Sequence, residues 1–401
     1  MAKELPYFKF EPSEWENGNI QICSREDKGL FLDLCSMYWA RLGELPFKLA
    51  VMKLCNGNAN AFDLLMQEEI FAVLDNFKHI VPQGGPMTGV GNNFQIASLS
   101  NCVVIPPVYD SYGGIFYTDQ QMAQLFKRRC GVGVDLSELR PKDAKVSNAA
   151  GSTTGAVSFM DRFSNTTREV AQNGRRGALM LTMDIAHPDI EEFVTIKQDL
   201  TKITGANISL RLSDEFMLAV VNNEDFKLRW PIDSKTPTYT KTIKAQELWN
   251  TIIKCAHNTA EPGLIFWDRQ HYYSTSSIYP GFKNSSTNPC SEIILRPYQF
   301  CNLSEVVLRE NDTKKDIQRK VELATILGTW QSTLTDFKYI RKIWKDNTEE
   351  ERLLGVSLTG QFGHKFMSGK EDLVSLEAFL MTLRESARAK NKDEAGKIGI
   401  P

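Results

Sequence analysis

The chain has 401 residues, with 47 Lys and Arg against 49 Asp and Glu, and therefore a formal net charge of −2. Hydrophobic residues make up 42% and charged residues 24%, which is ordinary for a globular protein, and no apolar run is long enough to predict a transmembrane helix. The balanced charge argues against non-specific nucleic-acid binding through bulk electrostatics, and the N-terminal sequence, which has no secretory signal pattern, favours a cytoplasmic protein.

Residues 1–70 are predicted to form a small, mainly helical N-terminal domain. The stretch LFLDLCSMYWARLG, which begins at Leu30, places apolar side chains along one broad helical face. The sequences YFKFEPSEW, GNIQICS and GLFLDLCSMYW resemble an N-terminal domain of phage and Firmicute-type replication proteins. That resemblance implies a winged-helix-like domain that contacts DNA, whereas the simpler interpretation is a helical cap packed on the main domain.

From about residue 75 the pattern changes to short apolar runs that alternate with helical segments. This alternation is typical of an α/β fold with many parallel strands. Glycines are frequent at the ends of the predicted strands, and such loops are where α/β folds place their functional sites. The predicted strands lie within residues 98–106, 131–136, 177–185 and 206–212, and the predicted helices within residues 119–131, 158–172 and 189–200.

The segment TNPCSEIIL, residues 287–295, contains the most informative cluster of polar residues. Asn288, Cys290 and Glu292 alternate along it. In an extended loop, side chains two residues apart point the same way, so these three are predicted to project into one space. A thiol can act as a nucleophile or a hydrogen-atom donor, a glutamate as a general base, and an asparagine as an orienting hydrogen-bond donor.

Two further cysteines add redox chemistry to this segment. Cys301 follows in FCNLSEV, and Cys102 lies upstream in SLSNCVV, each beside a predicted strand. Neighbouring strands can bring both sulfurs to the cavity of Cys290, and a dithiol that closes to a disulfide is a two-electron reductant. Three cysteines and a carboxylate together indicate reductive radical chemistry. The spacing of the cysteines and histidines predicts no metal site.

Residues 75–401 resemble the large catalytic chain of ribonucleotide reductase. The sequences that carry the resemblance are VPQG, SLSNCVV, DSYGGIF, KRRCGVGVDLSELRP, STTGAVSFMDRFSNTTREVAQNGRRGALM, HPDIEEF, DLTKITGANISLRL, EPGLIFWDR and TNPCSEIILRPYQFCNLSEV. The resemblance implies an α/β fold, an incomplete ten-stranded α/β barrel of the ribonucleotide reductase type. It also implies reduction of ribonucleoside di- or triphosphates to deoxyribonucleotides by thiyl-radical chemistry.

The spacing of eleven residues from Cys290 to Cys301 resembles that of class II members, whose cofactor is adenosylcobalamin. The alternative is a class I large subunit, whose radical comes from a separate small subunit. On either alternative, the resemblance makes Cys290 the thiyl-radical residue that abstracts the ribose 3′-hydrogen inside the barrel, shielded from water. Glu292 would accept the 3′-hydroxyl proton, and Asn288 would hydrogen-bond the ribose hydroxyls. Cys102 and Cys301 would deliver two electrons and become a disulfide, which a thioredoxin-type reductant would reopen.

The resemblance also implies substrate contacts and a separate effector site. Asn101 and Gly155 match positions that lie against the substrate. Asp110 matches the carboxylate that binds the ribose of an allosteric deoxynucleoside triphosphate, although a turn or a helix N-cap is the alternative for this residue.

Basic residues match the rest of the effector site. Arg175 and Arg176 match the effector-phosphate region, which suits the paired charge-assisted bonds of arginine, and their alternative is a solvated basic pair. Lys202 lies in the loop 199–207, which matches the specificity loop between effector and substrate base. The sequence GVGVD from Gly131 lacks the third glycine of a dinucleotide loop and predicts the tight start of a strand.

The sequence ends where family members continue with further barrel strands and a C-terminal cysteine pair. We therefore expect a fragment, a split-gene product that needs a complementary C-terminal chain, or a degenerate protein, without turnover on its own. Two alternatives are not catalytic: a deoxynucleotide-binding protein, and a DNA-associated replication protein that uses residues 1–70. We further expect a homodimer and no membrane association.

Overall fold

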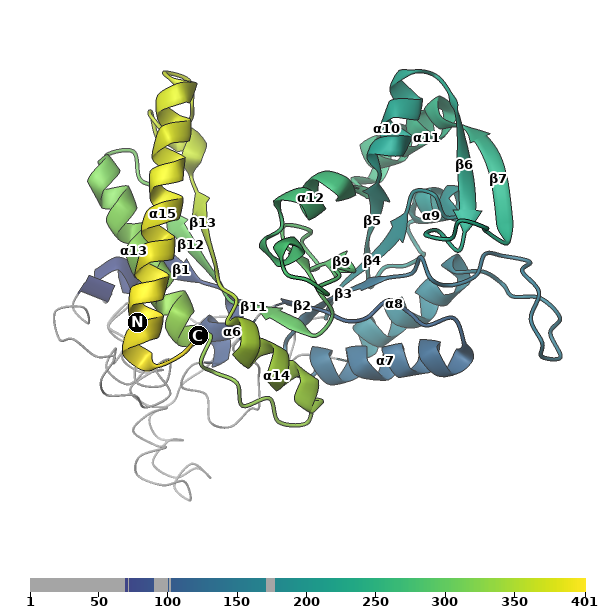
Figure 1. Cartoon of the computed structure of the whole chain (residues 1–401), viewed down its shortest axis with the longest axis horizontal. Coiled ribbons are helices and arrows are strands. Elements are labelled where there is room, and N and C mark those ends of the chain that lie inside the picture. Colours follow the sequence, from purple (N-terminus) through teal and green to yellow (C-terminus); the bar gives the residue numbers. More distant parts are fainter. Residues whose placement is uncertain (1–68, 71, 90–99, 101, 171–176) are drawn as a thin grey trace, which may run out of the picture. The chain divides into compact units, whose positions relative to one another are not determined.

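The computed structural model describes residues 69–401 except residues 71, 90–99, 101 and 171–176 (Figure 1). The predicted helical domain of residues 1–70 therefore lies almost wholly outside the described residues, and its boundary stays a prediction. The described chain falls into two compact units. The six-stranded unit contains residues 101–300 and 339–347, and the three-stranded unit contains residues up to 100 together with 301–338 and 348–401.

The six-stranded unit is built on a sheet with the strand order β11-β2-β3-β4-β5-β8 (Figure 1). Strands β2, β3, β4, β5 and β8 pair in parallel in that order. All of β3 and most of β4 are buried, and parallel strands covered on both faces are near-continuous apolar runs. The bounds are β2 Cys102–Val104, β3 Gly131–Asp135, β4 Ala178–Asp184, β5 Asn207–Leu212, β8 Gly263–Phe266 and β11 Gln299–Cys301.

Helices connect these parallel strands, so the predicted α/β alternation is confirmed. The first helix begins at Tyr112, earlier than predicted, because the Ser111 hydroxyl caps it by accepting the Gly114 N–H at 3.0 Å. A hairpin of β6 and β7 lies between two of the helices. The bounds are α7 Tyr112–Phe126, η5 Val157–Phe159, α8 Met160–Glu169, α9 Ile190–Thr195, η6 Ile196–Gln198, α10 Asp214–Val221, β6 Asp225–Trp230, β7 Tyr239–Lys244, α11 Ala245–Thr259, α12 Trp267–Tyr273, η7 Thr275–Ile278 and α14 Lys342–Glu351.

The three-stranded unit pairs β1 antiparallel with β12, and β12 parallel with β13. Two long helices, α13 and α15, pack against each other beside this sheet (Figure 1). Ile80, Ile317 and Trp330 are among the fully buried residues of their shared core. The bounds are η4 Asp75–Phe77, β1 Ile80–Pro82, α6 Gly84–Gly89, β12 Leu303–Val307, α13 Lys314–Gln331, β13 Gly355–Thr359, η8 Gln361–Gly363 and α15 Leu373–Ile398.

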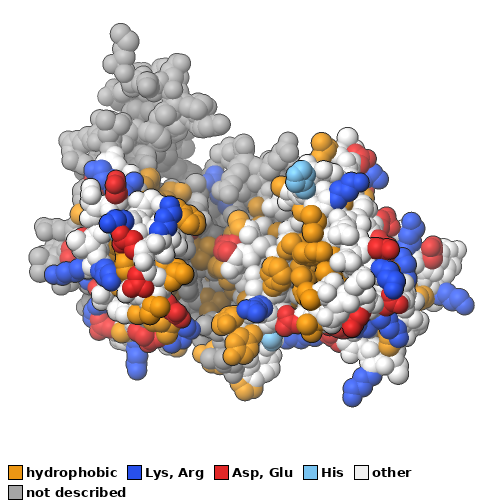
Figure 2. All heavy atoms as spheres, turned by 90° about the horizontal axis from the view of Figure 1, so that it is seen from above, with side chains coloured by type: hydrophobic (Ala, Val, Ile, Leu, Met, Phe, Trp, Pro, Cys, Tyr) orange, Lys and Arg blue, Asp and Glu red, His pale blue; other side chains and the backbone are white. Residues whose placement is uncertain are grey.

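The described surface mixes charges of both signs. Figure 2 shows Lys and Arg side chains interspersed with Asp and Glu over the visible face, in line with the net charge of −2. Within the described part of the chain, no helix is both long and apolar enough to cross a bilayer.

Candidate functional site

Cys290 lies at the tip of a short β-hairpin, which we call the Cys290 hairpin, residues 286–295. Its strands are β9, Ser286–Thr287, and β10, Ile294–Leu295, which pair antiparallel. Asn288 closes the turn: its N–H donates to the Ile293 carbonyl oxygen at 3.1 Å, and its Oδ1 accepts the Ile293 N–H at 3.1 Å. Ser291 adopts a left-handed φ of 68°. The segment is therefore a tight turn and not the extended loop that the sequence predicted.

The turn sets Asn288 apart from the two other polar side chains that were predicted to project with it. Asn288 is fully buried, whereas Cys290 and Glu292 are exposed in the described chain. The prediction of a common direction fails for Asn288, because side chains alternate regularly only in extended backbone, and it stays a prediction for Cys290 and Glu292. The Asn288 Nδ2 atom is buried and has no hydrogen-bond partner among the described residues. Cys290 is exposed within the described part of the chain, and its shielding inside a complete barrel stays a prediction.

The hairpin lies across β3, and the two glycines of that strand allow the close approach. A Cβ at Gly133 would collide with the Thr287 carbonyl oxygen. A Cβ at Gly131 would lie 2.8 Å from Pro289 Cγ and 3.4 Å from Cys102 Sγ. Gly131 and Gly133 therefore do more than start a strand: they let the backbone before Cys290 pack directly on the sheet.

The same contacts bring Cys102 next to the Cys290 hairpin. Cys102 begins β2 and is half-buried, with its sulfur on the Gly131 side that Pro289 also covers. Cys301 ends β11 and is buried, and it belongs to the three-stranded unit. The predicted redox pair of Cys102 and Cys301 stays a prediction. Cys130, next to Gly131, is a buried thiol.

Asp110 binds an arginine that the sequence analysis did not single out. Its Oδ2 accepts from Arg140 Nε at 2.7 Å, and its Oδ1 accepts the Arg140 N–H at 3.1 Å. The helix N-cap role suggested for Asp110 belongs instead to Ser111. A basic residue so close to the predicted ribose-binding carboxylate is a natural anion ligand. Because the partners are thirty positions apart in sequence, no local pattern reveals the pair.

Gly155 lies in a loop organised by a buried carboxylate. Asp189 Oδ2 accepts the Ala156 N–H at 2.9 Å, and its Oδ1 accepts the Lys142 N–H at 2.9 Å. Gly155 has φ +90°, and a Cβ there would lie 2.7 Å from Asp189 Oδ2. Glycine is therefore required for both backbone conformation and space. Asn101, the other predicted substrate contact, lies outside the described residues.

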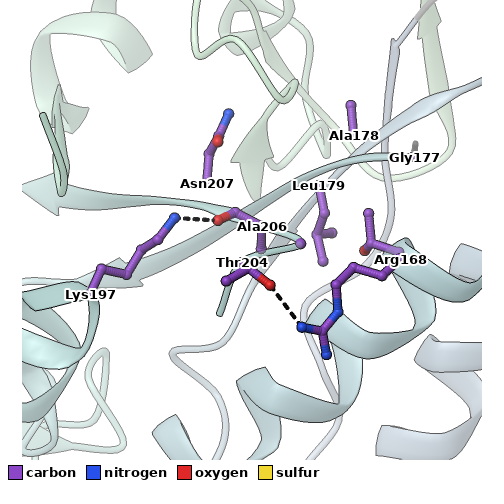
Figure 3. Close-up of a pocket in the computed structure, with 10 residues that line it drawn as sticks. Arg168, Gly177, Ala178, Leu179, Lys197, Thr204, Ala206 and Asn207 are labelled. Carbon is purple, nitrogen blue, oxygen red and sulfur yellow. Dashed lines mark hydrogen bonds between the residues drawn. The ribbon is translucent and has the colours of Figure 1, made fainter. Parts of the chain in front are cut away.

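The loop 199–207 borders a pocket of about 230 Å³ (Figure 3). Arg168 Nη1 donates to Thr204 Oγ1 at 2.7 Å, and Lys197 Nζ donates to the Ala206 carbonyl oxygen at 2.7 Å, so cations of two helical segments hold the loop. Lys197 also forms an ion pair with Glu261. Lys202 lies in the turn of this loop, where its N–H donates to the Asp199 carbonyl oxygen at 3.0 Å.

The predicted effector residues Arg175 and Arg176 fall outside the described residues. The described part of the chain instead shows Arg140 beside Asp110, and Arg168 and Lys197 beside the loop 199–207, and none of the three was predicted from the sequence. The signal for Lys197 and Arg168 would have been basic residues on helices that flank the predicted specificity loop. Across the described ranges, no cluster of three or more His, Cys, Asp or Glu side chains is arranged to hold a metal ion.

The parallel strands and the helices between them define an α/β protein. Its candidate site is a cysteine on a hairpin that packs against a glycine-containing strand of the sheet. Residues 100–382 match the family model "Ribonucleotide reductase, barrel domain", and the chain belongs to this family. The resemblance noted in the sequence is thereby confirmed.

Curated relatives bear printed names from the same family. A vitamin B12-dependent ribonucleoside-diphosphate reductase of Thermoplasma acidophilum is 37% identical over 243 residues, which cover 60% of this chain and 30% of the relative. A protein of the same name from Mycobacterium tuberculosis is 33% identical over 64% of this chain and 37% of its own length. A ribonucleoside-diphosphate reductase large subunit of Dictyostelium discoideum is 28% identical over 52% of this chain and 27% of its length. The chain thus spans about a third of the length of these relatives.

Proposed function

We propose that the chain is part of the catalytic chain of a ribonucleotide reductase. The observation that carries the proposal is the Cys290 hairpin seated on β3, with Cys102 beside it at Gly131. A thiol at a hairpin tip, backed by a rigid parallel sheet, presents one sulfur at a fixed place. A second sulfur close to Pro289, the residue before Cys290, is suited to supply reducing electrons.

The proposed reaction exchanges the ribose 2′-hydroxyl for hydrogen. Cys290, as a thiyl radical, removes the 3′-hydrogen and later returns it. Glu292 takes the 3′-hydroxyl proton while the 2′-hydroxyl leaves as water. Cys102 and Cys301 give up two electrons and two protons and become a disulfide, so atoms and electrons balance. Asn288 Nδ2, a buried donor without a partner among the described residues, supports a role in orienting the ribose hydroxyls.

Adenosylcobalamin is the proposed source of the radical, since relatives in Thermoplasma acidophilum and Mycobacterium tuberculosis are named for vitamin B12. When bound, this cofactor supplies a carbon radical by homolysis of its cobalt–carbon bond. The described residues fit it at one point, since Cys290 is an exposed residue at the tip of its hairpin. The class I alternative draws on the Dictyostelium discoideum relative, which is named a large subunit.

A deoxynucleoside triphosphate is the proposed effector. Asp110 supplies a carboxylate for ribose hydroxyls, and Arg140 supplies a guanidinium for phosphate. The pocket beside the loop 199–207 is smaller than the roughly 300 Å³ at which typical ligand pockets begin, so it suits a base and not a whole nucleotide. The proposal also includes a ribonucleoside di- or triphosphate as substrate and a thioredoxin-type reductant. It further includes a complementary C-terminal chain and a homodimer.

The test uses the full chain mixed with adenosylcobalamin, dithiothreitol and a deoxynucleoside triphosphate, with the cobalamin spectrum recorded over time. We expect conversion toward cob(II)alamin in the parent. We expect this conversion to be lost in Cys290→Ser, because the serine hydroxyl cannot replace the thiol as the site of the radical. Deoxynucleotide production is then measured after adding the remaining C-terminal part of the Thermoplasma acidophilum relative.

Cys255→Ala is the matched control, since this buried thiol lies in α11 and burial raises its pKa. The control should behave as the parent. A spectral change that persists in Cys290→Ser would contradict the proposed role of this thiol. Absence of any cobalamin response, also with the added C-terminal part, would contradict the class II assignment. Deoxynucleotide binding by calorimetry without such a response would favour the alternative of a nucleotide-binding protein.

A further inference from the structure

Arg211 is a buried cation held between two carboxylates at the carboxyl ends of the parallel strands. It lies on β5, and its side chain is 14% exposed. Its Nη2 donates to Asp184 Oδ2 at 3.0 Å, and its Nη1 lies 3.3 Å from Asp135 Oδ2. The guanidinium also stacks over the Trp267 ring at 4.4 Å. Ion pair and ring together leave the guanidinium little freedom to rotate.

The same guanidinium contacts the chain that leads into the Cys290 hairpin. Arg211 Nη1 donates to the Ser285 carbonyl oxygen at 3.1 Å. A second link runs through Thr182, whose Oγ1 donates to Asp135 Oδ2 at 2.8 Å and lies 3.0 Å from Ser286 Oγ. Ser285 and Ser286, the two residues that precede Thr287, are therefore bound to the sheet by Arg211 and Thr182. Both of these side chains also contact Asp135.

Burying a cluster of charged groups costs free energy, because the charges lose their contact with water. Burial raises the pKa of Asp135, and the positive charge of Arg211 opposes that rise. Apolar side chains of similar volume generally stabilise an interior as well as a buried ion pair does, so such a pair is weak evidence for a stabilising role. Apolar packing does not form directional hydrogen bonds. A planar guanidinium does, because its N–H groups have fixed directions and bond particular oxygen atoms.

We propose that Arg211, held by Asp135 and Asp184, is a positioning residue that fixes the segment 284–287 on the sheet and so sets where Cys290 lies. This inference rests on the proposed function, in which the sulfur of Cys290 must meet one ribose carbon. Arg211 touches neither substrate nor cofactor on this proposal. It acts through the Ser285 carbonyl, five residues before the thiol.

The test compares Arg211→Lys with the parent in the full chain, by hydrogen exchange and mass spectrometry. Lysine keeps the positive charge but loses the two-armed donor, so the Ser285 and Asp184 bonds do not form together. We expect at least about tenfold faster exchange in peptides that cover residues 286–295, because local opening becomes easier. Alkylation of the buried Cys255 by iodoacetamide should stay as in the parent, which would show that the unit as a whole has not opened.

Arg229→Lys is the matched control. Arg229 lies on β6 and makes a two-armed pair with Glu215, at 3.1 and 2.8 Å, away from the hairpin contacts described above. This variant should accelerate exchange over β6 and β7 and leave residues 286–295 unchanged. The two variants thus make the same chemical change at different places, and each should affect only its own segment.

Ser286→Ala is the second variant, and it decides the matter if Arg211→Lys does not fold. It removes one hydroxyl that Thr182 contacts and leaves the ion pairs intact, so a smaller acceleration over residues 286–295 is expected. Unchanged hairpin exchange in the folded variants, or an equal rise over every strand of the sheet, would overturn the inference. Neither readout requires turnover, so the cobalamin experiment on Cys290→Ser tests the proposed function separately.

Discussion

At Gly133 the protein has no room for a side chain, although the strand around it is regular. The obstacle is the Thr287 carbonyl oxygen, which lies where a Cβ would be. Strand interiors ordinarily disfavour glycine, so a glycine there marks a close approach by another segment. This contact explains why β3, a strand buried along its whole length, carries a glycine at its centre.

We expect Gly133→Ala to lower the free energy of unfolding by about 1–3 kcal/mol, because the methyl group forces the hairpin backbone off the sheet. The measurement is urea unfolding followed by circular dichroism. Gly113→Ala in α7 is the control, since its Cβ would find its nearest neighbour, Ser111 Oγ, at 3.8 Å. Equal stability of the two variants would show that the hairpin does not rest on β3.

The local sequence does not determine how the polar residues of the segment 287–295 are arranged. Asn288, Cys290 and Glu292 do lie in one short segment, but the left-handed φ of Ser291 turns the chain between them. Arg140 and Arg211 were missed because their carboxylate partners lie on other elements: Asp110 for the first, and Asp184 with Asp135 for the second. Such pairs depend on strand order, which no short pattern contains.

Among the elements, α13 shows how a terminal turn is specified. Thr313 Oγ1 accepts the Asp316 N–H at 3.2 Å, and Asp316 Oδ2 accepts the Thr313 N–H at 2.9 Å, which is a reciprocal capping box. These hydrogen bonds lower the pKa of Asp316. The helix then buries one face against β12, β13 and α15.

Thr313→Ala should lower the free energy of unfolding by about 1 kcal/mol, because the first turn loses its side-chain acceptor. Thermal unfolding of the variant measures the change. Thr382→Ala is the comparison, since that threonine is exposed inside α15 and donates only to the Ala378 carbonyl oxygen at 3.0 Å. A loss in Thr382→Ala as large as that in Thr313→Ala would argue against a specific capping contribution.

The parallel strands were the most predictable elements. Each of β3, β4 and β5 falls inside its predicted range, because a largely buried parallel strand is rich in apolar residues. The Cys290 hairpin was not predictable in the same way, since β9 and β10 are two residues long and show no periodicity. Its placement depends on the sheet beneath it.

At the scale of the whole molecule, a buried histidine links stability to pH. His187 is fully buried just before α9: its Nε2 donates to the Leu139 carbonyl oxygen at 2.8 Å, and its Nδ1 accepts the Asp189 N–H at 3.0 Å. The second bond requires the neutral ring, because a protonated Nδ1 cannot accept a hydrogen bond. Burial lowers the pKa of His187, so the unfolded state binds a proton at a higher pH than the folded state does.

The contribution of His187 is therefore present above the unfolded pKa of about 6.5 and is lost as pH falls through the lower folded pKa. Urea unfolding between pH 7.5 and 5 should show a decline of up to about 1.4 kcal/mol per pH unit from this one group. Asp135 acts in the opposite sense at lower pH: its raised pKa adds stability that is present below about 4 and lost as pH rises.

His187→Gln removes the titrating group, so its stability should depend less on pH over this range than that of the parent. Thr167→Ala serves as a control for destabilisation without titration, because it removes only a buried hydroxyl that donates to the Phe163 carbonyl oxygen. The control should keep the slope of the parent. An unchanged slope in His187→Gln would contradict the assignment.

The packing of the Cys290 hairpin on β3 also has a consequence for the order of folding. The glycines beneath it and Thr287 are separated by more than 150 positions in sequence, and Arg211 and Ser285 by 74. Contacts between such distant positions form slowly, because closing a long loop costs chain entropy before the contacts can stabilise the fold. The sheet is thus expected to assemble first and the hairpin to dock last. Substitutions in the hairpin should then mainly accelerate unfolding and leave the folding rate nearly unchanged.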